Sequence, residues 1–95
     1  MHYRVTKVNH GQGKRDDIIA YLKTKNEDIK SIEGLQSVRM IAISETESIS
    51  ISKYENEQQL TMAEEKFKEI MGGMMPFMTG PPEVSNGDEC WSVKK

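Results

Sequence analysis

The sequence predicts an α+β fold with the element order strand, helix, strand, strand, helix, strand, and three observations lead to it. Residues 48–54 alternate between two kinds of side chain, which is the period of a β-strand. The segments 14–31 and 57–71 instead carry apolar residues at helical spacing. A short polar turn, 45–47, joins residues 48–54 to the apolar run 35–44, so we expect these two runs to form a hairpin.

The first half of the chain supplies one strand and one helix. Residues 2–9 are rich in β-formers, but Val8 breaks the alternation, which predicts a bulge or a strong twist. Turn residues 10–13 follow, and a helix is expected over 14–31 with a polar gap at 25–26. Gly34 is a natural end for this helix.

The second half repeats the pattern. The strand 35–44 is apolar on both faces, as expected of a central strand. Asn56 is a good N-cap for the next helix, Gln59 resembles the second half of a capping box, and the pair 72–73 (Gly-Gly) is expected to end it. The apolar segment 74–82 reads as irregular, and a last short strand is predicted over 89–93.

This order predicts a ferredoxin-like βαββαβ domain covering residues 1–95, with an antiparallel sheet and both helices on one face. A chain of this size buries only roughly 60–65% of its unfolded surface. Because only 36% of the residues are hydrophobic, the core is thin, which favours dimerisation before any family is considered.

Charge and cysteine content exclude several classes of function. Lys and Arg number 13 against 15 Asp and Glu, and no basic face is concentrated enough for nucleic acid. A transmembrane helix and a signal peptide are not expected, so a cytoplasmic protein without membrane contact is predicted. The single cysteine, Cys90, gives neither an intrachain disulfide nor a metal-ligand spacing.

Several residues together resemble the dimeric α+β barrel superfamily, and within it the antibiotic-biosynthesis-monooxygenase-like (ABM) domains. They are Gly34 before the second strand, Tyr54 at the end of the third, the polar residues 55–57, Ala63 in the following helix, and 80–83 (Gly-Pro-Pro-Glu) before the last strand. The resemblance covers nearly the whole chain. It implies a homodimer in which two sheets share a barrel, often with the last strand reaching across to the partner.

The resemblance also implies a small pocket, either between each sheet and its helices or inside the barrel. In the quinone-forming branch no metal or flavin cofactor is used, and the substrate anion itself reduces oxygen beside hydrogen-bonding Asn, Tyr and Trp groups. Tyr54 and Trp91 are therefore the candidate catalytic groups. The haem-degrading branch does not fit, because the matching positions carry Thr6, Tyr54 and a helix without histidine.

The alternation along residues 48–54 also predicts a binding surface. If Ile49 and Ile51 face the helices, the opposite side chains face the barrel interior and offer hydroxyl groups to an oxygen-rich aromatic ligand. The commoner alternative is a solvated sheet face. Arg4 and Thr6 of the first strand share a parity and are added to this surface. Arg4 either holds an anionic substrate or forms a salt bridge. The candidate binding residues are therefore Arg4, Thr6, Ser48, Ser50, Ser52 and Tyr54.

Other side chains have weaker claims to a chemical role. His10 lies in a Gly-rich turn and is expected to be exposed, and neither it nor His2 has metal-ligand neighbours. Trp91 is expected to anchor the core or an interface, and Cys90 has no basic neighbour that would make it a nucleophile. The methionines at 71, 74, 75 and 78 form either a pocket mouth or a core plug.

Two functions from different classes therefore stay open. The first is a small-molecule-binding dimeric barrel that acts as a cofactor-independent monooxygenase on a small aromatic or hydrophobic substrate. The alternative is a non-enzymatic binding or structural dimer, with a stress- or signal-related barrel as a variant in which the dimer surface matters more than the pocket.

Overall fold

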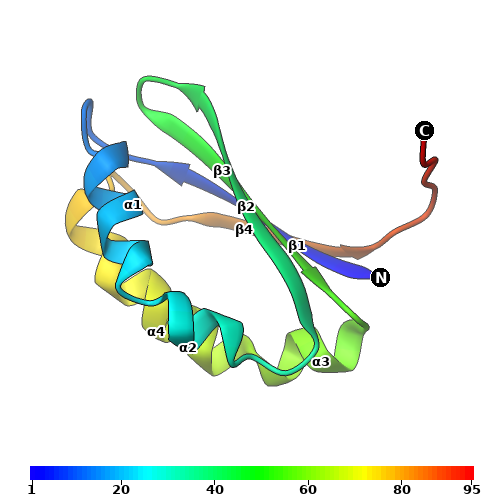
Figure 1. The fold of residues 1–95 in the computed structure, drawn as a ribbon. Helices are drawn as coiled ribbons and strands as arrows, with labels where there is room; N and C mark the ends of the chain where they lie inside the picture. The colour runs from blue at the N-terminus through cyan, green and yellow to red at the C-terminus, as the bar shows by residue number, and fades with distance from the viewer.

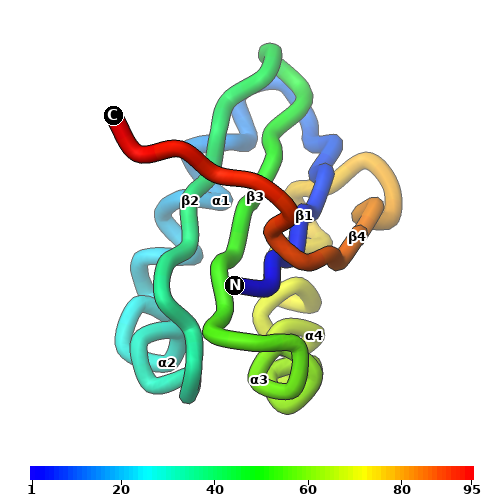
Figure 2. Tube along the Cα trace, turned by 90° about the vertical axis from the view of Figure 1, so that its right-hand side faces the viewer, coloured from blue at the N-terminus to red at the C-terminus, as the bar shows by residue number.

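A four-stranded antiparallel sheet, in the order β2-β3-β1-β4, forms one layer of the protein in the computed structural model, which describes residues 1–95. All helices cover one face of this sheet, and the other face is open (Figure 1). The strands lie side by side in Figure 2. The strands are β1 (His2–Asn9), β2 (Leu35–Ser44), β3 (Glu47–Tyr54) and β4 (Glu83–Asp88). The helices are α1 (Arg15–Lys23), α2 (Asn26–Lys30), α3 (Glu57–Met62), α4 (Glu64–Met74) and the short 3-10 helix η1 (Met75–Phe77). The ferredoxin-like α+β arrangement predicted from the sequence is confirmed.

Both predicted helices are divided into two. The first breaks after Lys23, where the Thr24 hydroxyl donates a 2.6 Å hydrogen bond to the Tyr21 carbonyl and so competes with the helical ladder. The second breaks at Ala63. Asn56 is its N-cap as predicted, since Asn56 Oδ1 accepts a 2.9 Å hydrogen bond from the Gln59 amide. The capping box is not completed, because the buried Gln59 Oε1 has no hydrogen-bond partner.

The prediction that Gly72 and Gly73 end the second helix is wrong. The helix α4 continues through both residues to Met74. A Cβ atom at Gly73 would collide with the ring and hydroxyl of Tyr21, whereas one at Gly72 would meet open space. Tyr21 lies there because its hydroxyl donates a 2.8 Å hydrogen bond to the Ile70 carbonyl. Gly73 is therefore a point of close approach between α1 and α4, which the sequence does not reveal.

Three predictions about the strands also need correction. Of the two alternatives predicted at Val8, a bulge or a strong twist, the bulge is absent, because the pairing of β1 with β3 runs without a break from His2 to Asn9. The strand β2 lies at an edge of the sheet and not in its centre, so its apolar residues are mostly exposed. The last strand is the polar segment 83–88, not 89–93, because main-chain pairing with β1 fixes it.

The predicted orientation of β3 is inverted. Ser48, Ser52 and Tyr54 are buried on the face that the helices cover, and Ile49 and Ile51 lie on the open face. The register explains this result, because Ser52 and Ser50 pair with Arg4 and Thr6 of β1, whose even-numbered residues are the buried ones. The polar side of the sheet is thus turned towards the helices.

The hydrophobic core is split between the two ends of the sheet–helix interface. Val8, Ile18 and Met74 form one buried cluster, and Tyr54, Leu60 and Ala63 form the other. These clusters lie at opposite ends of β1, because Tyr54 pairs with His2. The space between them is occupied by a cavity.

Candidate functional site: a cavity between the sheet and the helices

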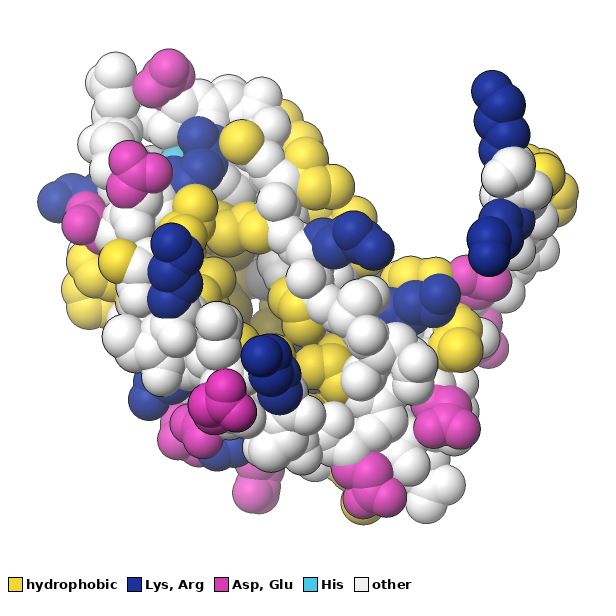
Figure 3. All heavy atoms as spheres, in the orientation of Figure 1, with side chains coloured by type: hydrophobic (Ala, Val, Ile, Leu, Met, Phe, Trp, Pro, Cys, Tyr) yellow, Lys and Arg dark blue, Asp and Glu magenta, His cyan; other side chains and the backbone are white.

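The cavity has a volume of about 590 Å³ and lies between the helix-covered face of the sheet and the helices α1, α2 and α4. In the space-filling view a hollow with hydrophobic walls opens beside the helices, and Lys or Arg side chains stand at its edge (Figure 3). Cavities of roughly 300–1,000 Å³ are typical of small-molecule sites. The volume therefore lies within the range of small-molecule sites.

Apolar side chains from three directions form most of the wall. They number 13 of the 21 lining residues. The α1–α2 side contributes Ile19, Leu22 and Ile29, α4 contributes Phe67, Ile70, Met71 and Met74, and the edge strand β2 contributes Leu35, Val38 and Met40. Desolvation by this wall would account for most of a ligand's affinity.

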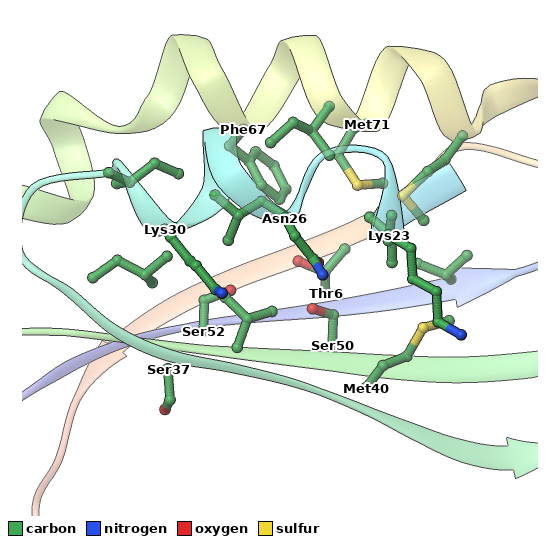
Figure 4. Close-up of a pocket in the computed structure, with 18 of the residues that line it drawn as sticks. Thr6, Lys23, Asn26, Lys30, Ser37, Met40, Ser50, Ser52, Phe67 and Met71 are labelled. Atoms are coloured by element: carbon green, nitrogen blue, oxygen red, sulfur yellow. The ribbon is translucent and has the colours of Figure 1, made fainter. Parts of the chain in front are cut away.

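Hydroxyl groups line the sheet side of the cavity. Thr6 comes from β1, and Ser50, Ser52 and Tyr54 come from β3; Figure 4 shows the first three below the helices. Thr6 and Ser50 are directly paired across the two strands. None of the side-chain hydrogen bonds of the structure uses the hydroxyl of Thr6, Ser50 or Ser52. These groups are free to bind the oxygen atoms of a ligand.

Tyr54 is held at the cavity wall by a buried arginine. Arg4 is 0% exposed, and its Nη1 donates a 3.0 Å hydrogen bond to the Tyr54 hydroxyl. Its Nη2 binds Glu64 Oε2 at 2.5 Å and the Leu60 carbonyl at 3.3 Å. The guanidinium also lies 4.0 Å from the centre of the Phe67 ring, an arrangement that favours a cation–π interaction.

The protonation state of Tyr54 follows from these surroundings. Burial raises its pKa above the usual value, although the charge and hydrogen bond of Arg4 act in the opposite direction. The side chain is therefore a neutral phenol at physiological pH. Because its oxygen accepts from Arg4, its proton remains available for donation into the cavity.

The structure brings together four of the six predicted binding residues, Thr6, Ser50, Ser52 and Tyr54, on the cavity wall. Arg4 does not line the cavity and acts through Tyr54. Ser48 is fully buried elsewhere: it accepts a 2.8 Å hydrogen bond from Arg15 Nε and lies 3.0 Å from His10 Nε2.

The histidines and the tryptophan lie away from the cavity. The expectation that His10 is exposed is wrong, because it is 1% exposed and bridges Ser48 and the Gly11 carbonyl. His2 Nδ1 lies 2.5 Å from Asp88 and lowers the pKa of that carboxyl. Trp91 is 77% exposed on a C-terminal tail that projects from the open side of the sheet, so it does not anchor the core of this chain (Figure 1).

Sequence reasoning missed the polar residues at the cavity mouth. Lys23, Asn26 and Lys30 line the cavity from the α1–α2 side, and Figure 4 shows them extending towards the strands. Exposed lysines on a helix usually belong to the solvated surface, so their residue type alone does not indicate a binding site. Their helical spacing from Ile19 and Ile29 would have predicted that they lie beside the apolar stripe of the first helical segment.

No group of three or more His, Cys, Asp or Glu side chains lies close enough to hold a metal ion. No helix has the length and apolar composition needed to span a bilayer.

No protein-family model and no curated protein matches the sequence. Among solved structures, a monooxygenase from the gene ActVA-Orf6 of Streptomyces coelicolor, in complex with the ligand nanaomycin D, superposes with a TM-score of 0.82 at 17% identity, over 99% of this chain and 91% of that one. Proposed antibiotic biosynthesis monooxygenases from Nitrosomonas europaea and Caulobacter crescentus both give TM-scores of 0.78. The Nitrosomonas protein is 10% identical over 96% of this chain and 100% of its own. The Caulobacter protein is 16% identical over 95% of this chain and 90% of its own.

The chain has the fold of the antibiotic biosynthesis monooxygenases. The resemblance seen in Gly34, Tyr54 and Ala63 is thus confirmed at the level of this fold, over nearly the whole chain. At 10–17% identity the likeness concerns the monooxygenase fold alone.

Proposed function

We propose that this protein binds a small aromatic or hydrophobic molecule carrying hydrogen-bonding oxygens in the cavity between its sheet and helices. The observation that carries the proposal is the 590 Å³ apolar cavity with a row of unpaired hydroxyls on its sheet side. The apolar walls would hold the rings, and Thr6, Ser50 and Ser52 would bind their oxygens. Tyr54, kept protonated by burial and oriented by Arg4, would donate the remaining hydrogen bond.

The proposed reaction is the oxygenation of an electron-rich phenol to a quinone. A phenol and O₂ yield a quinone and water: one oxygen atom enters the ring, the other leaves as water, and the substrate supplies all four electrons. This chemistry needs no group on the protein that changes oxidation state. Support comes from the monooxygenase fold and from the hydroxyls that would hold the substrate next to the oxygen.

A non-enzymatic binding protein is the second candidate, and one observation favours it. No histidine and no carboxylate lines the cavity, since His2 and His10 are engaged elsewhere. A substrate would therefore have to lose its proton without a strong base beside it. Binding and turnover must be measured separately for this reason.

We further propose that two copies associate through the open sheet faces. This face carries paired apolar side chains, with Val5 opposite Ile51 and Ile41 opposite Ile49. Val5 is 40% and Ile41 44% exposed in the isolated chain. A partner sheet would cover them, and the exposed Trp91 and Val93 of the tail would pack across the same interface.

The cavity proposal is tested by filling the cavity. The wild type, Ser50→Leu and the control Gln58→Leu, which adds the same side chain at an exposed position of α3, are titrated with a dihydroxynaphthalene under air. Oxygen uptake and product mass are followed in parallel. We expect binding to weaken more than about tenfold in Ser50→Leu and to be unchanged in the control, because leucine occupies the space of the ligand rings.

Each result decides between the candidates. Binding with oxygen uptake and a quinone product supports the monooxygenase, and binding without uptake supports the binding protein. Equal binding by Ser50→Leu and the wild type would show that the cavity is not the site.

A further inference from the structure

The charges around the cavity are all of one sign. Lys23 and Lys30 are the only charged residues among the 21 that line it, and no Asp or Glu is among them. The whole chain has the opposite balance, with a net charge of −2. Acidic residues are present on the same helices, at Asp16, Asp17, Glu27 and Asp28, but none of them lines the cavity.

Neither lysine is neutralised by the protein. The ion pairs that lysines form in the structure involve Lys7, Lys14 and Lys66, whose ammonium groups lie 3.5–3.9 Å from carboxylates, and include neither Lys23 nor Lys30. Both side chains are exposed at the mouth, and Figure 4 shows each extending from the helix side towards the strands. Asn26 lies between them and adds an amide group to the same edge.

We infer that the ligand is an anion: an aromatic or hydrophobic molecule whose single negative group, a carboxylate or a comparable oxyanion, stays at the mouth between Lys23 and Lys30. This inference rests on the proposed function and adds the charge of the ligand to it. The rings enter the apolar cavity, and the anionic group remains hydrated beside two unpaired ammonium groups. A cleft with apolar walls and charge of one sign concentrates ligands of the opposite sign, and salt screens this attraction.

Two ligands that differ only in charge should therefore bind with different affinities. The probes are anilinonaphthalene sulfonate and its uncharged counterpart phenylnaphthylamine, both followed by fluorescence. They are titrated into the full chain, into the Lys23→Gln/Lys30→Gln variant and into the control Lys68→Gln, an exposed lysine of α4 that neither lines the cavity nor forms an ion pair. Thermal melts of each variant verify the fold.

We expect the wild type to bind the sulfonate more tightly than the neutral probe, by about two- to fivefold for each lysine. The double variant should lose this preference, whereas its affinity for the neutral probe and both affinities of Lys68→Gln should be unchanged. Raising NaCl from about 0.05 M to about 1 M should have the same effect as the double variant.

Two failures are distinguishable. Equal affinity of the wild type for both probes at low salt, or a preference that survives in the double variant, overturns the anionic ligand and leaves the proposed function standing. The Ser50→Leu variant is titrated with the same two probes, and if it binds both as tightly as the wild type, the cavity itself is not the binding site and the proposed function fails as well.

Discussion

Arg4 Nη1 donates a 3.0 Å hydrogen bond to the hydroxyl of Tyr54, so the one tyrosine of the cavity wall is fixed by a buried cation. Glu64 balances the charge of Arg4 at 2.5 Å from the outer side, where the carboxylate side chain is 39% exposed. The arrangement joins β1, β3 and α4 at one end of the cavity. It gives partners to both terminal nitrogens of the buried guanidinium, whereas the buried Arg4 Nε has no hydrogen-bond partner, and it holds the Tyr54 hydroxyl in place.

Replacing Tyr54 by phenylalanine is expected to destabilise the protein. The variant leaves Arg4 Nη1 buried without its acceptor, which costs about 1–3 kcal/mol in free energy of unfolding. Urea unfolding monitored by circular dichroism measures this change. The control is Tyr3→Phe, whose hydroxyl bonds Glu89 at the surface and should matter by less than about 0.5 kcal/mol. Equal stability of both variants would contradict the role given to the Arg4–Tyr54 bond.

The free energy of unfolding should decrease as the pH rises through the alkaline range, because of Tyr54. Burial raises its pKa in the folded state above the value of about 10 in the unfolded chain. Above about pH 10 the unfolded chain therefore releases a proton that the folded chain retains, which favours unfolding. The free energy of unfolding, measured between about pH 9 and 11, should decline less steeply in Tyr54→Phe than in the wild type. Parallel curves would show that this phenol titrates normally.

The two neighbouring glycines of α4 should respond oppositely to alanine. At Gly72 a Cβ meets open space, so alanine should stabilise the helix by about 0.5–1 kcal/mol. At Gly73 it would collide with Tyr21, and the overpacking should cost about 1–3 kcal/mol. Thermal and urea unfolding of both single variants measures the contrast. Introducing Gly73→Ala into a Tyr21→Ala background should remove most of the penalty, and an unchanged penalty there would rule out the proposed contact.

The dimer proposal predicts a sharp change on charging the open face. Light scattering of the wild type at micromolar concentration should give about twice the monomer mass of 10.8 kDa. Ile51→Lys, which introduces a charge opposite Val5, should give the monomer mass. Trp91, the only tryptophan, should then emit at longer wavelength as it loses its cover. A monomeric wild type would refute the proposal.

Side-chain periodicity predicted the fold well, because it reports which segments are strands and which are helices. The bounds of β1 and β2, the Asn56 cap and the ferredoxin-like order all follow from local patterns. Periodicity does not say which side of a strand is covered, however. For β3 the choice was set by pairing with Arg4 and Thr6, and apolarity alone placed Ile49 and Ile51 on the wrong face.

The cavity was predictable only in part, for a related reason. Thr6, Ser50, Ser52 and Tyr54 share a parity, so their grouping could be seen in the sequence. Lys23 and Lys30 join them only because the fold places α1 and α2 across the cavity from the strands, which brings distant segments together. The β-forming residues around Trp91 led to the prediction of a last strand over 89–93, whereas hydrogen bonds to β1 select the polar segment 83–88.

The location of the ligand tests the account most directly. Backbone amide chemical shifts of the isotope-labelled protein are recorded during titration with a hydroxylated naphthoate, which combines rings, oxygens and one carboxylate. We predict that the largest changes cluster at Thr6, Ser50, Ser52 and Tyr54 and at the mouth around Lys23 and Lys30. Changes confined to the open face, at Val5, Ile41 and Ile49, would contradict the cavity as the binding site.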